Sequence, residues 1–207
     1  IGLLLTGQAS QTVALEAIAI AELRKDCVAF ISPEQADVVN NEGNEVDAII
    51  DYRTGLGTSS YAVLEEQTAS GVDAGTFTTG AWRTRDLNTT VVDPDSIITS
   101  LSSGEFTLVA GNYLIRWYAS AFSVNSHKTR LYDVTGTALM GGGSAEWAGS
   151  SLVTSSSTGS ARVTPSGSNV YRLEHQCTVT HSTQGLGVPA GFSQVEVFAR
   201  VEILKES

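Results

Sequence analysis

Regular alternation of apolar and polar residues marks the later two-thirds of this chain of 207 residues. In residues 170–179 the side chains of Tyr171, Leu173, His175, Cys177 and Val179 fall on one face of an extended segment. The same period of two recurs in residues 194–203, and in residues 106–110 and 113–122 on either side of a Gly-Asn turn. Successive side chains of a strand point to opposite faces, so this period indicates strands with one buried face. Short strands separated by turn signals, with no helical pattern, predict an antiparallel jelly-roll sandwich over residues 76–207.

The first 65 residues have a different pattern, in which short apolar runs alternate with segments of helical periodicity. Apolar runs lie at residues 3–5, 27–31 and 60–64, and helical patterns follow Ser10 and surround Ile49. This β-α-β-α-β order predicts parallel strands with right-handed crossovers. So few elements cannot cover both faces of a parallel sheet, which predicts a small, incomplete α/β segment. Residues 66–75 show no periodicity and are interpreted as a linker.

Composition excludes several classes of partner. Lys and Arg number 12 against 22 Asp and Glu, so the formal charge is −10 and binding to nucleic acid through its phosphates is disfavoured. No apolar run approaches the roughly 18 residues that a membrane span needs, so we expect no membrane insertion. The two cysteines, Cys27 and Cys177, cannot form a disulfide framework and are interpreted as free, buried thiols.

One stretch of the first segment carries a family resemblance. The string RKDCVAFISP occupies residues 24–33, and Tyr52-Arg53 and the string SSYAVL at residues 59–64 follow it. Together they resemble the tail-sheath protein of contractile-tailed phages. The resemblance implies a location in the virion, in a phage tail, and contacts with other phage tail proteins.

Four motifs in a fixed order carry a second resemblance in the later part of the chain. They are GAWRTRDLNT at residues 80–89, FTLVAGNY at 106–113, HKTRLY at 127–132 and LEHQC at 173–177. The set is similar to a jelly-roll tip domain of phage tail fibres, which resembles the trimeric heads of the complement and tumour-necrosis-factor superfamily. The resemblance implies a homotrimer whose chain ends meet at a stem.

That arrangement predicts which loops reach the free tip. If the last strand ends at the stem, the loop of residues 182–192 lies at the tip, together with segments near residues 144–151 and 123–128. An exposed Trp beside polar residues can stack on a sugar ring or anchor a protein contact, although Trp147 could equally pack inward. The predicted ligand-binding residues of the tip are Asn125, His127, Glu146, Trp147, His181 and Gln184.

No catalytic residues, cofactor or metal are predicted. Histidines lie among many Ser and Thr residues, but the chain has no G-x-S-x-G nucleophile elbow. His175 and Cys177 could join symmetry mates as metal ligands on a threefold axis, although hydrogen-bonded packing in an interface is the favoured interpretation. Arg130 and Arg172 are expected to form surface or interface ion pairs.

These features favour a non-catalytic phage tail fibre or adhesin, whose trimeric jelly-roll head binds a glycan or protein of the host surface. The alternative is a purely structural tail-sheath, decoration or trimerisation component without receptor binding. A third hypothesis, a glycan-processing enzyme, lacks the pair of carboxylates that such chemistry needs.

Overall fold

The computed structural model describes residues 60–149 and 151–206, and this part of the chain is built from β-strands without a helix. None of the described residues forms a helix with the length and apolar character of a membrane span. The strands are β1 (Tyr61–Thr68), β2 (Arg83–Thr84), β3 (Thr89–Val92), β4 (Ile98–Ser102), β5 (Glu105–Leu108), β6 (Asn112–Phe122), β7 (Asn125–Asp133), β8 (Ala138–Ala148), β9 (Thr154–Val163), β10 (Asn169–Cys177) and β11 (Glu196–Glu206).

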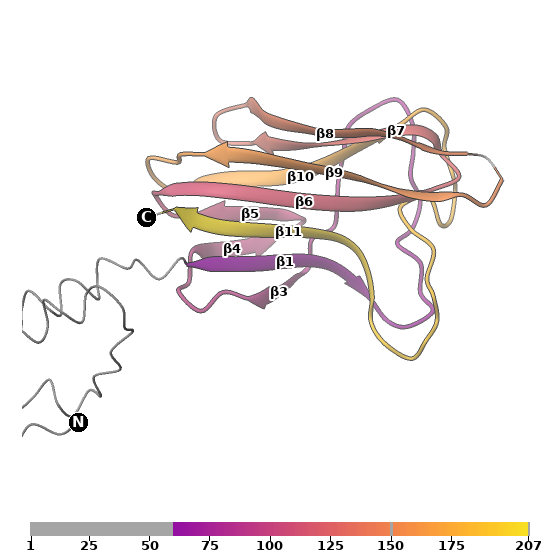
Figure 1. The fold of residues 1–207 in the computed structure, drawn as a ribbon, viewed down its shortest axis with the longest axis horizontal. Helices are drawn as coiled ribbons and strands as arrows, with labels where there is room; N and C mark the ends of the chain where they lie inside the picture. The colour runs from indigo at the N-terminus through magenta and orange to yellow at the C-terminus, as the bar shows by residue number, and fades with distance from the viewer. Residues whose placement is uncertain (1–59, 150, 207) are drawn as a thin grey trace, which may run out of the picture. The chain divides into compact units, whose positions relative to one another are not determined.

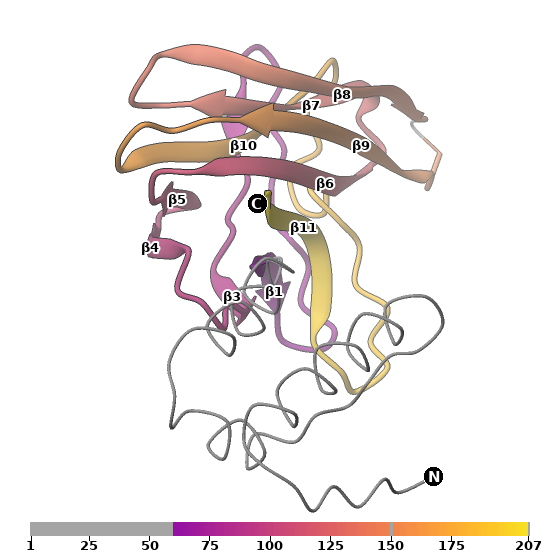
Figure 2. The same ribbon diagram turned by 60° about the vertical axis from the view of Figure 1, so that its left-hand side comes forward.

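The strands form two antiparallel sheets that pack face to face as a jelly roll (Figures 1 and 2). The first sheet has the order β3-β1-β11-β6-β9, and the second has the order β4-β5-β10-β7-β8 with β2 added beside β10. Four pairs are nested along the chain, namely β1 with β11, β5 with β10, β6 with β9 and β7 with β8. This nesting is that of one long hairpin rolled up, and it confirms the predicted jelly-roll sandwich.

The core lies between the sheets and takes one face of each strand. It is lined by aromatic and aliphatic side chains that include Phe106, Tyr113, Ile115, Trp117 and Tyr171. Trp117 is accommodated by a glycine on the neighbouring strand, because a Cβ atom at Gly159 would lie 2.3 Å from the indole. A second, smaller apolar cluster consists of Phe77, Ala121, Val124, Ala148 and Cys177.

The expected faces of β10 and β11 are confirmed in most positions. Tyr171, Leu173, His175 and Cys177 are buried along β10, whereas Val179, beyond the end of this strand, is 39% exposed. The alternation of β11 shifts by one residue at Phe198, which is buried beside buried Ala199. Glu196 is therefore buried, and Val195, which the alternation predicts on the buried face, is 60% exposed. The pairing explains the shift, because Glu66 of β1 faces Ala199 while Gln67 faces Val197. Phe198 is therefore the extra residue of a β-bulge, which turns its side chain inward.

The strand expected at residues 60–64 belongs to the sandwich, so the predicted parallel pairing is wrong there. β1 runs antiparallel to both β11 and β3, and it continues to Thr68 through the first residues of the predicted linker. All described strands belong to one compact unit that begins at Thr58. The remainder of the predicted α/β segment, with the tail-sheath string at residues 24–33 and Cys27, lies outside the described residues.

Candidate functional site

Three connections predicted to reach the tip lie together at one end of the sandwich. β1 begins and β11 ends at the opposite end, on the left of Figure 1. β6 starts beside the end of β11, since Asn112 pairs with Glu206, and therefore finishes at the far end. There β6 connects to β7, and the register places the end of β8 beside Asn125 and the start of β9 beside Phe122. We call this the distal end; it includes residues 123–124, 149, 151–153 and 178–195.

The six predicted tip residues do not form one exposed surface. Trp147 is exposed, with 61% of its surface accessible, so it does not pack inward. Asn125, Glu146, His181 and Gln184 are half-buried. Glu146 and Trp147 are consecutive on β8 and therefore point to opposite faces of the second sheet.

His127 corrects the prediction most clearly, because only 3% of its surface is exposed. It lies on the inward face of β7 with Thr129 and Leu131, whereas Ser126 and Lys128 face outward. The sequence contained this signal. The string HKTRLY alternates, so a strand that buries Leu131 places Thr129 and His127, two and four residues earlier, on the same buried face. His127 is therefore part of the interior of the head and is not accessible to a ligand.

His181 helps to hold the long loop between β10 and β11. Its Nδ1 atom accepts a hydrogen bond from the Gln184 backbone N–H at 3.3 Å, and its ring meets Phe122 edge to face, with the centroids 5.2 Å apart. Its backbone pairs with Phe77 in an isolated bridge. His181 and Gln184 thus stabilise the loop conformation as well as facing the distal end.

Beneath the distal end lies a buried polar cluster centred on Arg85. This side chain is fully buried, and its Nε atom donates to the Glu66 carboxylate at 2.6 Å. Its two terminal nitrogens donate to the Leu186 carbonyl at 3.1 Å, and one of them also donates to the Ser120 carbonyl at 3.0 Å. Arg85 therefore connects β1, β6 and the long distal loop, and nothing in the local sequence indicated this role.

A chain of hydrogen bonds continues from Arg85 through two histidines to a serine. One Arg85 nitrogen lies 3.5 Å from the Nδ1 atom of His175, the Nε2 atom of His175 lies 2.9 Å from the Nδ1 atom of His127, and the Nε2 atom of His127 lies 2.7 Å from the Ser155 hydroxyl. Burial lowers the pKa of His127 to about 4, and it lowers the pKa of His175 well below its usual value. Both rings are therefore neutral at physiological pH.

The direction of these bonds follows from the donors present. Arginine only donates, so the Nδ1 atom of His175 accepts and its Nε2 atom carries the proton. His175 then donates to the Nδ1 atom of His127, and neutral His127 donates from its Nε2 atom to Ser155. We assign the tautomers on this basis. A general base would have to accept the serine proton at that nitrogen, so this serine and histidine pair is in the wrong protonation state for nucleophilic catalysis.

The hypothesis of a metal on a threefold axis fails for His175 and Cys177. Both side chains lie inside the sandwich, with 0% and 4% of their surfaces exposed. In residues 60–149 and 151–206, no group of three or more His, Cys, Asp or Glu side chains could hold a metal ion. Burial also raises the pKa of the Cys177 thiol to about 11, which leaves it protonated. The predicted free, buried state of Cys177 is confirmed.

A shallow groove of about 260 Å³ crosses the outer face of the second sheet near the distal end. Polar side chains of β7 and β10 and the ring of Trp82 line it, and Arg130 lies against that ring, with its guanidinium carbon 4.2 Å from the ring centroid. Arg130 and Arg172 both bind the Glu174 carboxylate, and Arg172 also binds Glu105 at 3.1 Å. The ion pairs predicted for these two arginines are confirmed.

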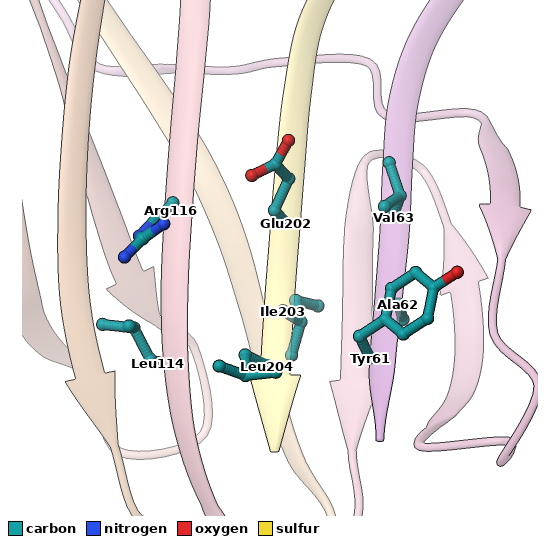
Figure 3. Close-up of a pocket in the computed structure, with 8 residues that line it drawn as sticks. All are labelled: Tyr61, Ala62, Val63, Leu114, Arg116, Glu202, Ile203 and Leu204. Carbon is teal, nitrogen blue, oxygen red and sulfur yellow. The ribbon is translucent and has the colours of Figure 1, made fainter. Parts of the chain in front are cut away.

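A second groove, of about 350 Å³, lies on the outer face of the first sheet (Figure 3). Tyr61 and Val63 of β1, Leu204 of β11 and Leu114 of β6 form an apolar stripe across three neighbouring strands. Tyr61 and Leu204 are 46% and 39% exposed. Arg116 of β6 and Glu202 of β11 are opposite each other in the strand register, at the edge of this stripe.

Comparisons with known proteins give likenesses of fold only. No family model matches the chain, and no curated protein matches it. Murine APRIL at pH 5.0 is similar over 72% of this chain and 100% of its own, with 9% identity and a TM-score of 0.47. The globular domain of the zebrafish complement 1qA protein is similar over 70% of this chain and 94% of its own, with 14% identity and a TM-score of 0.43. The PRD1 vertex protein P5 is similar over 73% of this chain and 99% of its own, with 14% identity and a TM-score of 0.44.

Proposed function

We propose that this chain is a virion attachment protein, whose jelly-roll head forms a homotrimer and binds a host-surface ligand without catalysis. The observation that carries the proposal is the separation of the two ends of the head. The chain enters β1 and leaves β11 at one end, while Trp147, residues 151–153 and the loop of residues 178–195 lie at the other. A head that is attached at the first end leaves the distal end free to contact a ligand.

Exposed apolar side chains at the distal end support binding there. Leu152 and Phe192 are each 84% exposed, and Val195 and Trp147 are 60% and 61% exposed. Large apolar side chains that are exposed together at one end of a domain indicate a contact surface, because burying them against a partner stabilises the complex.

The apolar stripe of Tyr61, Val63, Leu114 and Leu204 supports the homotrimer. In a monomer this stripe is exposed to solvent on the outer face of the first sheet. Contact with a second copy buries its apolar surface, which is favourable. We propose that copies of the head meet through this face, with the three distal ends side by side. Weak contacts from three heads then combine into avidity for a repeated ligand.

The absence of catalysis is proposed from the chemistry of the best-placed nucleophiles. Ser155 accepts a hydrogen bond from His127, and the Cys177 thiol is buried and protonated. The virion location and the contacts with other phage tail proteins rest on the sequence resemblances at residues 24–33 and 80–177. Residues 1–59 would supply the attachment.

The apolar stripe alone would also suit a purely structural trimerising or decorating component, so the experiment must separate the two functions. Light scattering on the purified chain gives the oligomeric state, and a mass three times 21.8 kDa is expected. Binding to a panel of bacterial envelope preparations is then compared for the unmodified chain, Trp147→Ala and Leu139→Ala. Leu139 is a matched control because it also lies on β8 and is 59% exposed, but at the opposite end of the strand.

Binding that Trp147→Ala weakens and Leu139→Ala preserves supports attachment through the distal end. A trimer that binds no preparation supports the structural component instead. A stable monomer overturns the trimer and the avidity that depends on it.

A further inference from the structure

The groove on the outer face of the second sheet is built from side chains that the register places side by side. Lys128 of β7 faces Gln176 of β10 on one side and Ala145 of β8 on the other. One step nearer the distal end, Ser126 faces Trp147 across β7 and β8. Residues directly opposite in an antiparallel pair share a face, so all of these side chains project from the same surface.

Aromatic rings stand at both borders of this surface. Trp82 lines the groove on the side of β2 and β10. Trp147 of β8 faces Ser126 of β7 and lies on the same surface, beyond the residues that line the groove. The four neighbouring strands β2, β10, β7 and β8 span three interstrand intervals, or about 14 Å. This is longer than a single sugar ring and matches a short oligosaccharide lying across the strands.

Trp82 is held in place before any ligand arrives. The Arg130 guanidinium stacks on its ring, and the Arg130 Nε atom donates to Glu174, which is itself 2% exposed. Arg172 donates to the same carboxylate at 2.8 Å. A ring fixed by such a network loses little conformational entropy on binding, which favours affinity.

The groove also carries one uncompensated positive charge. Arg130 and Arg172 are paired with Glu174 and Glu105, so these four charges cancel. Lys128 is exposed on the floor and takes part in none of the ion pairs formed among the described residues. In a chain with a net charge of −10, a lone cation on this surface selects for an anionic group on the ligand.

We propose that this groove binds an acidic oligosaccharide, in which sugar rings stack on Trp82 and Trp147 and a sugar carboxylate pairs with Lys128. The biological role of this site rests on the proposed attachment function, and the proposal specifies the class of ligand that the attachment protein binds. The hydroxyl and amide groups of Ser126, Gln176 and Thr178 suit sugar hydroxyls, which need donors and acceptors at several points.

The test uses the full chain and defined oligosaccharides, one set containing a uronic or sialic acid and a second set with the same sugars reduced to neutral alcohols. Affinities are measured by calorimetry for the unmodified chain, Lys128→Gln, Trp82→Phe and Arg162→Gln. Arg162 is a matched control, because it is an exposed cation on β9 of the first sheet. Thermal unfolding of each variant reports whether the fold is retained.

We expect the acidic set to bind and Lys128→Gln to weaken that binding about tenfold, as loss of a charge-assisted hydrogen bond predicts. Arg162→Gln should bind as the unmodified chain does, and affinity should fall as salt rises. Equal binding of the neutral set, full affinity in a folded Lys128→Gln, or no binding of any saccharide would each overturn the proposal. Envelope binding that Trp147→Ala abolishes and Lys128→Gln preserves would overturn this ligand class while leaving the attachment function intact. Binding of the acidic saccharides without binding to any envelope preparation would support this ligand class and overturn the attachment function.

Discussion

The Nδ1 atom of His127 lies 2.9 Å from the Nε2 atom of His175, so one of the two nitrogens must donate and the other must accept. Arg85 fixes the choice at one end of this pair and Ser155 receives the last proton at the other. The charged groups that face the pair are Arg85 with its partner Glu66, and Glu146 on β8. A second proton on His127 would have to sit on Nδ1, where His175 already donates, so protonation breaks the pair.

The stability of the head should therefore fall in mild acid. The folded state binds no proton at His127 until the pH reaches about 4, whereas the unfolded chain binds one near the ordinary value of 6.5. Between these values the unfolded state holds more protons, so the free energy of unfolding decreases as the pH falls from about 6.5 and the effect levels off near 4. The loss from this residue should be about 3 kcal/mol.

Urea unfolding at a series of pH values measures this dependence. Carboxylates add their own acid sensitivity, so the comparison is with His127→Gln, which lacks the titrating ring. The variant should be less stable at pH 7 and should lose less stability between pH 7 and 4. Equal slopes for the two chains would contradict the assignment.

A second prediction concerns the buried ion pair of Arg85 and Glu66. Arg85→Met leaves the Glu66 carboxylate in the interior without its partner, and the free energy of unfolding should fall by about 3–5 kcal/mol. Replacing both residues, as in Arg85→Met with Glu66→Leu, removes the unpaired charge and should recover part of that loss. Arg162→Met, which breaks the exposed pair with Glu206, should change stability by less than about 1 kcal/mol. Denaturant midpoints for the four chains test the prediction, and a double variant no more stable than Arg85→Met would contradict it.

Local alternation was enough to predict the inward faces of β10, and it contained the signal for His127 as well. It could not identify partners distant in sequence. The run at residues 60–64 has the same apolar pattern in a parallel or an antiparallel strand, and only the pairing of Tyr61 with Leu204 distinguishes them. Arg85 looks like any surface arginine in the string GAWRTRDLNT, because its partners come from β1, β6 and the loop at Leu186.

Ser155 shows the same limit in a segment with no useful pattern. β9 is rich in Ser and also contains Gly, neither of which indicates a strand, and its position is set by pairing with β6 along its whole length. The tip loops could be ordered from the expected topology, but the side on which each residue faces depends on the register of β7 with β8. That register places Trp147 beside Ser126 on the outer face and Glu146 beside His127 on the inner face.

A third prediction concerns the reactivity of Cys177. With a pKa raised to about 11 by burial, its thiol should contain about a hundredfold less thiolate than a thiol of the ordinary pKa of 9.0. Iodoacetamide at pH 8 should therefore leave the peptide that contains Cys177 unlabelled in the native protein and label it fully in denaturant. Peptide mapping by mass spectrometry separates this peptide from the one that contains Cys27. Fast native labelling of Cys177 would show that the small apolar cluster around it is open to solvent.

A fourth prediction concerns Glu196, which connects the loop before β11 to the segment that follows β1. Its carboxylate accepts hydrogen bonds from the backbone N–H groups of Ala190, Gly191 and Gly71, at 3.0, 2.7 and 3.1 Å. These bonds lower the pKa of Glu196, since they favour the charged form. Glu196→Gln keeps the shape but replaces one oxygen with an NH₂ group, which cannot accept from a backbone donor.

The loop should then open more often, and Phe192, which is already 84% exposed, offers a site for chymotrypsin within it. We expect cleavage after Phe192 to be faster in Glu196→Gln than in the unmodified chain, with faster hydrogen exchange at Gly71, Ala190 and Gly191. Because the pKa is lowered in the folded state, the carboxylate stabilises the loop at neutral pH, and this contribution is lost as the pH falls through the folded value. Exchange at the three amides should accordingly accelerate, relative to amides of β6, when the unmodified chain is acidified. Glu206→Gln at the opposite end is the control, and cleavage that is equally slow in both variants would mean that other contacts hold the loop.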